Sequence, residues 1–418
     1  MASQALVKEF QRLLGTEQVL LEETDRATYA YDAAVLEPVL PAIVLMPRSA
    51  EDLGQVVRLC QENALPLTVR GAGTNLSGGT VPGRGGAVVL TTALNKILEI
   101  NEADLYAVVQ PGVVTARLAG AVEAKGLFYP PDPGSMAVST LGGNVAENAG
   151  GLRGLKYGVT RDYVMGLEVV LADGEVITLG NKCVKDVAGY SMKDIFIGSE
   201  GTLGIIAKVL LQLVPKPAAK KTLLATFSEM DAAAETVSAI IAAKIIPCTL
   251  EFLDKITIRC VEEYAHVGLP LDAEAVLLME TDGHPAVVQE EAQQMAEIAR
   301  RNGATGVQLA QTPEEATLLA TARRVAFSAL ARVAPTTILE DATVPRSELA
   351  NMIRFIQQVA GRAAPAEQSL ENSSSHFAIG GGLSERSKVA SLTTLNFLYK
   401  TFVSGLGLNR FCCRHSAS

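Results

Sequence analysis

Three loops of the chain combine closely spaced glycines with hydroxyl and amide side chains. They are RGAGTNLSGGT (70–80), the glycine-rich part of PPDPGSMAVSTLGGNVAENAGGLRGLKYGVTRDYV (130–164) and GSEGTLGII (198–206). Because glycine allows positive φ angles and a close approach to the backbone, successive N–H groups in such loops can converge on a phosphate. Each loop alone could simply make turns, but the three together predict a site for a long anionic cofactor.

Two familiar phosphate-binding motifs are excluded by their spacing. Gly71-x-Gly73 is followed by Leu76, where the dinucleotide fingerprint requires glycine or alanine. No loop continues into the Gly-Lys-Ser/Thr sequence of a P-loop. Asparagine and hydroxyl side chains can instead bond phosphate oxygens without adding fixed charge.

Short strands and helices surround these loops. The stretch 47–69 contains a predicted helix, with Ser49 and Asp52 in the pattern of a capping box, and a strand is predicted to end at Arg70. A second helix should end at Gly126, and Asp173-Gly174 should join two strands of a hairpin. This part of the chain therefore mixes α and β structure without strict βαβ repetition.

After residue 217 the alternation becomes regular. The pattern predicts strands at 222–227, 247–254, 275–283 and 304–311 and helices at 229–244 and 285–302. It indicates a second domain in which an antiparallel sheet carries helices on one face.

Composition restricts the class of protein. The chain has 418 residues, 48% of them hydrophobic, which suits two or three globular domains. Its formal net charge of −9 gives no general attraction for nucleic acid, and no segment reaches the roughly 18 uninterrupted apolar residues of a spanning helix. Helical spacing of apolar residues from Leu6 to Leu14, without the apolar run of a signal peptide, predicts a cytoplasmic protein. Cys60, Cys183, Cys248 and Cys260 are expected to be buried thiols.

The ordered set of motifs resembles a known family. RGAGTNLSGGT, PPDPGSMAVSTLGGNVAENAGG, KYGVTRDYV and GSEGTLGI are similar to the PCMH-type FAD-binding domain of the vanillyl-alcohol-oxidase superfamily, on the branch of the glycolate oxidase flavoprotein subunits and D-lactate dehydrogenases. The resemblance runs from about Tyr29 to Val359. It implies an α+β protein made of an N-terminal helical segment (1–36), an FAD-binding PCMH-type domain of two α/β subdomains (37–217), an antiparallel-sheet substrate cap that is incomplete at its C-terminus (218–360) and a divergent tail (361–418).

The resemblance also implies which residues hold FAD. The positions that match the family's cofactor motifs are Arg70, Gly71, Gly73, Thr74, Asn75, Leu76, Ser77, Gly78, Pro131, Asp132, Ser139, Thr140, Gly143, Asn144, Asn148, Gly150, Gly201 and Ile206. Members with covalently attached FAD often have histidine where this chain has Thr74, so noncovalent FAD is expected. Asp132 either bonds part of the cofactor or caps a turn.

The expected reaction is oxidation of a small 2-hydroxy acid, glycolate or D-lactate, by hydride transfer to flavin N5. ATARRVAFSAL resembles a cap motif whose arginine holds the substrate carboxylate, and Arg323 aligns better than Arg324. A planar guanidinium suits a carboxylate because it makes two charge-assisted bonds. The alternative is a surface helix with two solvated arginines. Electrons would pass to an iron–sulfur partner subunit or a quinone, and such a partner could hold the protein at the inner face of a membrane.

The C-terminal residues depart from the family. Relatives take their general base and a divalent-metal site from a histidine motif of the form HxGDGNxH and a later EHG segment, which residues 361–418 lack. His376 and His415 have no partner spacing for metal ligation, and His266 and His284 are expected at the surface, so no metal site is predicted. Either the family's C-terminus is truncated or replaced, or the tail has diverged to another task. The alternative function is thus a flavin-binding protein or subunit with little turnover.

Overall fold

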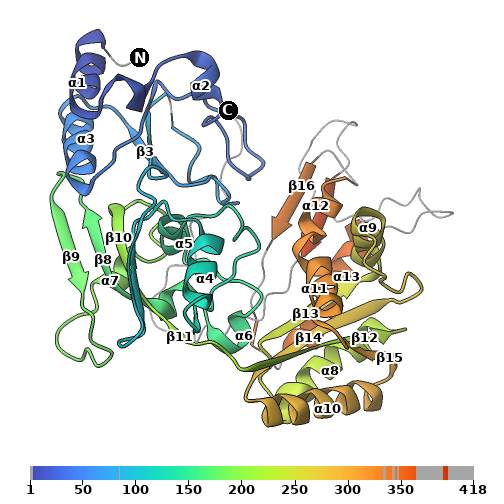
Figure 1. Cartoon of the computed structure of the whole chain (residues 1–418). Coiled ribbons are helices and arrows are strands. Elements are labelled where there is room, and N and C mark those ends of the chain that lie inside the picture. The colour runs from blue at the N-terminus through green and yellow to red at the C-terminus, as the bar shows by residue number, and fades with distance from the viewer. Residues whose placement is uncertain are drawn as a thin grey trace.

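The chain forms two domains that lie side by side (Figure 1). The computed structural model describes residues 3–83, 85–332, 336–340, 344–345, 348–363 and 389–393. We call the part up to β11 (Val214–Pro215) the N-terminal domain and the part from β12 (Ala219–Phe227) onward the C-terminal domain. Three residues connect them.

The first sheet of the N-terminal domain has the strand order β1-β2-β4-β3. Strand β3, which is parallel to β4, ends at Arg70, and the first glycine loop begins there. Helices α1 and α3 cover it, and Ser49 Oγ caps α3 by accepting a hydrogen bond from the Asp52 N–H at 3.0 Å, as the sequence predicted. The elements are α1 (Gln4–Leu14), η1 (Thr16–Gln18), β1 (Val19–Leu20), α2 (Glu23–Ala27), β2 (Ile43–Leu45), α3 (Ala50–Glu62), β3 (Leu67–Arg70) and β4 (Ala87–Leu90).

The second sheet is antiparallel, in the order β5-β6-β10-β8-β9. Strands β8 and β9 form the predicted hairpin, and Gly174 takes a positive φ of 78° in its turn. Helices α4 and α5 pack on this sheet over a core that includes Leu118, Leu141 and Val209. The elements are β5 (Ile97–Asn101), β6 (Tyr106–Val109), α4 (Thr115–Glu123), β7 (Leu127–Phe128), α5 (Leu141–Glu147), α6 (Gly154–Tyr157), η2 (Thr160–Tyr163), β8 (Val164–Val170), β9 (Val176–Gly180), α7 (Lys193–Phe196) and β10 (Ile205–Gln212).

The C-terminal domain contains the predicted antiparallel sheet, in the order β13-β14-β12-β15. Four strands and two helices occur where the sequence placed them. The elements are β12, α8 (Met230–Ala242), β13 (Thr249–Asp254), α9 (Lys255–Ala265), β14 (Ala275–Gly283), α10 (Pro285–Arg301), β15 (Ala304–Leu309), α11 (Pro313–Arg324), α12 (Ala326–Leu330), β16 (Thr336–Glu340), α13 (Leu349–Ala363) and β17 (Val389–Thr393).

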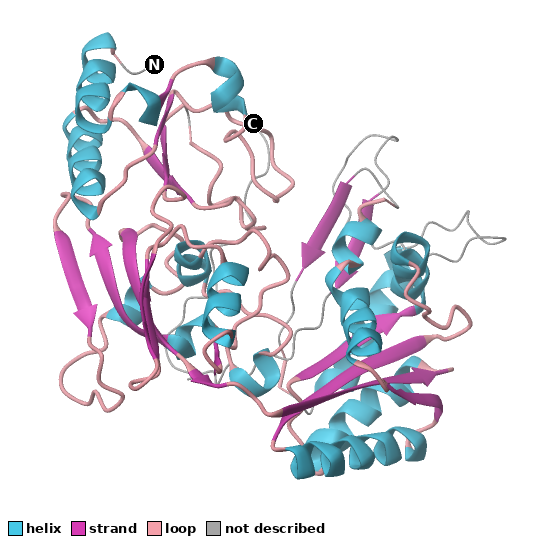
Figure 2. Ribbon diagram, in the orientation of Figure 1, coloured by secondary structure: helices cyan, strands magenta, loops and turns pink. Residues whose placement is uncertain are grey.

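The prediction of helices on one face of this sheet was wrong. Leu223 and Leu277 pack against α8 and α10, whereas Leu224 and Leu278 pack against α9, α11 and α12. Figure 2 shows helices on both sides of the sheet. Central strand β14 is consequently buried along almost its whole length, and both its odd and even positions must be apolar or paired.

Two other expectations can be compared with the structure. Cys60 and Cys248 are buried as predicted. The prediction was wrong for Cys183, which is exposed in the loop after β9, and Cys260 in α9 is only partly buried. No helix in the described ranges has the length and apolar character needed to cross a membrane.

Candidate functional site

The three glycine loops meet around one cavity of about 410 Å³ between the two sheets of the N-terminal domain. This volume is within the roughly 300–1,000 Å³ typical of small-molecule sites. The predicted cofactor residues that line it are Gly71, Gly73, Thr74, Asn75, Leu76, Ser139, Thr140, Gly143, Asn144, Gly201 and Ile206. Loops that are far apart in the sequence, from Gly71 to Ile206, therefore share one site.

Asp32 and Arg70 hold the first loop in place. Asp32 Oδ2 accepts a hydrogen bond from Asn75 Nδ2 at 2.8 Å and another from Thr80 Oγ1 at 3.1 Å. Arg70 is buried and donates to the carbonyl oxygen of Tyr31 at 2.6 Å. Burial lowers the pKa of Arg70, and the negative charge of Asp32 counteracts this effect. Gly73 has a φ of 72°, and a Cβ there would overlap the Arg70 guanidinium, so the loop requires glycine.

The second loop is organised by the start of α5. Thr140 is the N-cap residue, and its Oγ1 accepts a hydrogen bond from the Gly143 N–H at 3.4 Å. Asn144 is buried and donates from Nδ2 to Thr115 Oγ1 at 2.7 Å. Gly143 lies within α5 and has no positive φ, and a Cβ at this position would come within 3.2 Å of Thr140 Oγ1.

The third loop docks onto α5. The N–H groups of Gly198 and Glu200 donate to the carbonyl oxygens of Val145 and Ala146 at 3.0 and 2.9 Å. Gly201 follows with a φ of 75°. These contacts fix the position of the third loop relative to the second.

The remaining predicted cofactor residues do not line the cavity. They are Arg70, Ser77, Gly78, Pro131, Asp132, Asn148 and Gly150. Ser77 bridges loops by donating from Oγ to Glu147 Oε1 at 3.2 Å. Asn148 ends α5 in the left-handed conformation, and its Oδ1 accepts a hydrogen bond from the Arg161 N–H at 2.9 Å. Several of these residues thus support the loops around the cavity.

The cavity is also lined by two carboxylates that were not among the predicted cofactor residues. Glu147 and Glu200 come from the second and third loops, and their carboxylate oxygens would each lie 3.7 Å from a Cβ on Gly79. Burial raises the pKa of Glu147, the nearby Glu200 raises it further, and the hydrogen bond from Ser77 acts in the opposite direction. Both glutamates belong to the quoted motifs, but spacing alone does not show that they face the same space.

Because Glu147 lines the cavity and has a raised pKa, we expect FAD binding to depend on pH. A phosphate bound beside Glu147 would raise the pKa of the Glu147 carboxyl further, so FAD binding would be accompanied by proton uptake. The affinity for FAD should therefore increase several-fold as the pH falls through the raised pKa of Glu147. Glu147→Gln should bind FAD more tightly at neutral pH and with a flatter pH profile. The measurement is flavin fluorescence titration across pH. Glu123→Gln, which alters an exposed ion pair with Lys216, is the control; an equal slope in both variants would contradict the assignment.

The lining suits the phosphate-containing part of FAD. A Cβ at Gly71 would overlap Thr140 Oγ1, so glycine keeps the space between the first and second loops open. Among the described residues that line the cavity there is no lysine or arginine, so the donors are backbone amides and hydroxyl or amide side chains, among them Thr74, Asn75, Ser139 and Thr140. Gly71, Gly73, Gly143 and these side chains would hold the cofactor.

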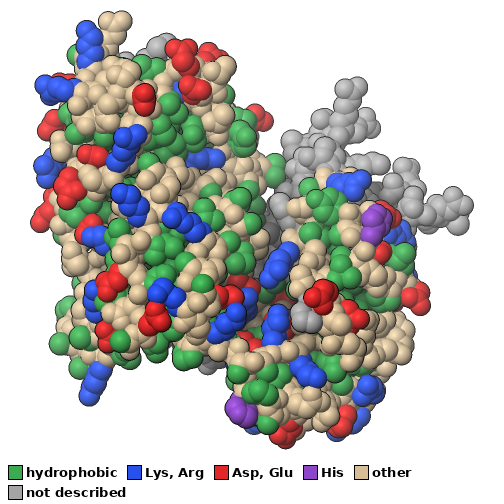
Figure 3. All heavy atoms as spheres, viewed as in Figure 1, with side chains coloured by type: hydrophobic (Ala, Val, Ile, Leu, Met, Phe, Trp, Pro, Cys, Tyr) green, Lys and Arg blue, Asp and Glu red, His purple; other side chains and the backbone are tan. Residues whose placement is uncertain are grey.

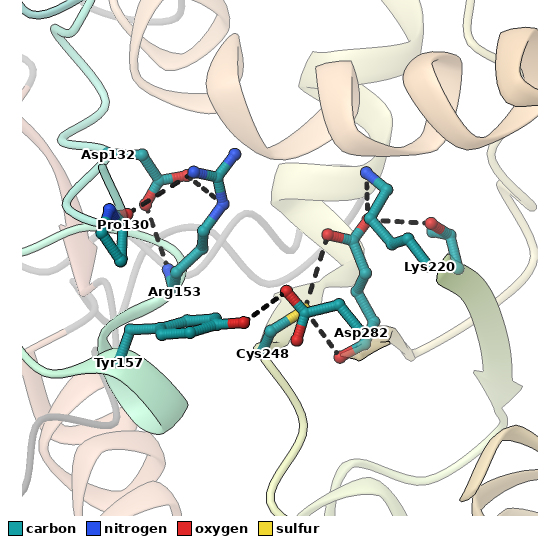
Figure 4. A network of polar contacts seen from close by, with 9 residues as sticks. Pro130, Asp132, Arg153, Tyr157, Lys220, Cys248 and Asp282 are labelled. Atoms are coloured by element: carbon teal, nitrogen blue, oxygen red, sulfur yellow. Dashed lines mark hydrogen bonds and ion pairs between the residues drawn. The ribbon is translucent and has the colours of Figure 1, made fainter. Parts of the chain in front are cut away.

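A second polar cluster lies where α6 meets the C-terminal domain (Figure 4). Asp132 is buried, accepts a hydrogen bond from the Arg153 N–H at 3.1 Å and pairs with Arg153 Nε at 3.4 Å. Burial raises the pKa of the Asp132 carboxyl, while the charges of Arg153 and Arg324 lower it. Of its two predicted roles, the contacts of Asp132 favour the structural one.

The predicted substrate arginine lies at the end of α11. The side chain of Arg323 is outside the described residues, whereas Arg324 is close enough to Asp132 to affect its pKa. This end of α11 therefore faces the N-terminal domain. His266 and His284 are exposed at helix ends of the C-terminal domain, and His376 and His415 lie outside the described residues. Within the described ranges, no three His, Cys, Asp or Glu side chains are grouped to hold a metal ion.

Comparison with known proteins identifies a family for each of the two domains. Residues 41–180 match the family described as FAD binding domain, and residues 216–378 match the C-terminal domain of FAD linked oxidases. In solved structures, an alkyldihydroxyacetonephosphate synthase has a TM-score of 0.67 at 22% identity and aligns with 80% of this chain and 65% of its own. A p-cresol methylhydroxylase has a TM-score of 0.66 at 19% identity, over 76% of this chain and 69% of its own. These structures share the fold.

Relatives of known sequence are much more similar. The glycolate oxidase subunit GlcD of Bacillus subtilis is 56% identical over 337 residues, which cover 81% of this chain and 72% of that protein. A D-lactate dehydrogenase of Anaerostipes hadrus is 33% identical over 369 residues, covering 86% of this chain and 77% of that protein. With FAD as the family cofactor, an α+β architecture and both family domains present, the chain belongs to the FAD-linked oxidases of the glycolate oxidase subunit and D-lactate dehydrogenase family.

Proposed function

We propose that the chain oxidises a small 2-hydroxy acid, glycolate or D-lactate, with noncovalently bound FAD and passes the electrons to an iron–sulfur partner subunit or a quinone. The observation that carries the proposal is the single cavity lined by all three glycine loops. The names of the relatives support the substrate class. The threonine at position 74, which lines the cavity, supports a dissociable cofactor.

The reaction removes a hydride from the α-carbon and a proton from the hydroxyl, and it yields a 2-oxo acid. Bound FAD supplies the hydride acceptor. The protein must supply a carboxylate clamp, a proton acceptor and an orientation that brings the α-carbon to the flavin. Figure 3 shows charged side chains gathered where the two domains meet, which is where α11 presents its C-terminal end.

Arg323 is the proposed carboxylate clamp. Arg323→Lys should weaken binding of oxalate or a 2-hydroxy acid by about 1–3 kcal/mol, because lysine keeps the charge but loses the planar fork. The measurement is the change in flavin absorbance on titration with oxalate. Arg324→Lys is the matched comparison, since it changes the neighbouring arginine of the same helix. Equal affinity in Arg323→Lys and the unaltered chain, with weaker binding in Arg324→Lys, would assign the clamp to Arg324.

A flavin-binding protein with little turnover is the second candidate. It is favoured by the positions of two histidines, because His266 follows the last residue of α9 and His284 precedes the first residue of α10, and both are exposed on the C-terminal domain. Reduction of the bound flavin by glycolate or D-lactate without oxygen distinguishes the two candidates. A catalyst reduces its flavin at a rate that supports turnover, and a binding subunit does not.

A further inference from the structure

Helix α6 (Gly154–Tyr157) connects the cofactor cavity to the other domain. On one side it follows the second glycine loop, in which Ala149 lines the cavity. The Ala149 carbonyl oxygen accepts hydrogen bonds from the Thr160 N–H at 3.1 Å and from Thr160 Oγ1 at 2.7 Å. These bonds close the loop that contains α6, so a shift of α6 would be transmitted to the cavity wall.

On its other side α6 holds Asp282, at the end of β14. Lys156 Nζ pairs with Asp282 Oδ1 at 2.5 Å and also donates to the Asp282 carbonyl oxygen, and Tyr157 OH donates to Asp282 Oδ2 at 2.8 Å. Figure 4 shows Tyr157 pointing at Asp282 across the domain boundary. The N-terminal domain thus binds both carboxylate oxygens of Asp282, which belongs to the C-terminal domain.

The burial of this contact makes it energetically important. Asp282 is 6% exposed, and removing a partner from a buried ion pair leaves an uncompensated charge. Burial and the hydrogen bond to Asp282 both raise the pKa of Tyr157, so its hydroxyl remains a donor over the working pH range. The neighbouring Glu280 differs, because its carboxylate is bound by Lys220 and Thr222 of its own domain.

We propose that Asp282 is a positioning residue that couples docking of the C-terminal domain to FAD binding. Held by Lys156 and Tyr157, it fixes α6 and thereby the second glycine loop, although it does not itself line the cavity. Coupling of this kind is reciprocal, so FAD must also stabilise the docked C-terminal domain. The proposal rests on the FAD site described above.

The test compares FAD affinity and hydrogen exchange in matched variants. Asp282→Asn should weaken FAD binding about tenfold, within the roughly 5- to 150-fold range of such couplings. Tyr157→Phe should give a smaller loss, and the double variant should lose less than the product of the two, because the hydroxyl acts through Asp282. FAD should protect the amides of β14 from exchange in the unaltered chain and protect them less in Asp282→Asn.

Glu280→Gln is the control, since it removes the same charge from the same strand without touching α6. It should bind FAD as the unaltered chain does. An unchanged affinity and exchange pattern in Asp282→Asn, or an equal loss in Glu280→Gln, would overturn the proposal. If Asp282→Asn does not fold, Tyr157→Phe decides in the same way. Absence of FAD binding in the unaltered chain would refute the FAD site itself and the coupling with it.

Discussion

Replacing Gly71 with valine should lower the affinity of the chain for FAD at least about 100-fold, which corresponds to about 2.8 kcal/mol. A Cβ at this position would overlap Thr140 Oγ1, the N-cap oxygen of α5, so either this hydroxyl must rotate away from its capping position or the first and second loops must separate. The added methyl groups of valine would then occupy the space in which the loop amides are expected to meet a phosphate.

The experiment is a titration of the apoprotein with FAD, followed by flavin fluorescence, with circular dichroism to confirm folding. Gly120→Val is the matched control. Gly120 lies in α4, where an added Cβ would meet nothing within 4 Å, so this variant should bind FAD normally. A folded Gly71→Val protein with unchanged affinity would remove Gly71 from the cofactor site.

Bound flavin should be reduced by glycolate or D-lactate about 10²–10⁴-fold more slowly than in a version that carries the family's C-terminal histidine motifs. A general base must lie within hydrogen-bond reach of the substrate hydroxyl, and positioned bases contribute rate factors of this size. His266 and His284 occupy exposed helix ends, where the first closes α9 and the second caps α10. Neither position suits that role.

Anaerobic stopped-flow mixing with each acid, followed by loss of flavin absorbance, measures this rate. Oxalate affinity should be similar in the chain and in the restored version, because the proposed clamp, Arg323, is present in both. Equal reduction rates would show that another residue supplies the base and that the histidine motifs are not needed.

Local sequence patterns were sufficient for most of the secondary structure and for expecting that the three glycine loops form one cofactor site. The individual positions came from the resemblance to the family, and Gly71, Thr140 and Gly201 are among those that line the cavity. The supports of the same loops could not be predicted in this way. Asp32 reaches Asn75 across 43 positions of the sequence, and no local pattern indicates such a contact.

The C-terminal domain shows the same limit in its helices. AVLLMETDG predicts a strand, and its unbroken apolar run is typical of a strand buried on both faces. The apolar run from Ala275 to Met279 therefore favours helices on both faces of the sheet rather than on one face, and residues on each face of β14 pack against helices. Asp282, at the polar end of the strand, has no distinguishing neighbour in the sequence, because its partners Lys156 and Tyr157 lie more than 120 positions away.

Reconstitution of the unaltered chain with FAD tests most directly whether the three glycine loops form a noncovalent flavin site. The apoprotein should bind one FAD per chain, become yellow and release all of its flavin into the supernatant when the polypeptide is precipitated by mild acid. A colourless protein that binds no FAD would contradict the cofactor site. Flavin that stays attached to the precipitated polypeptide would contradict its noncovalent binding beside Thr74.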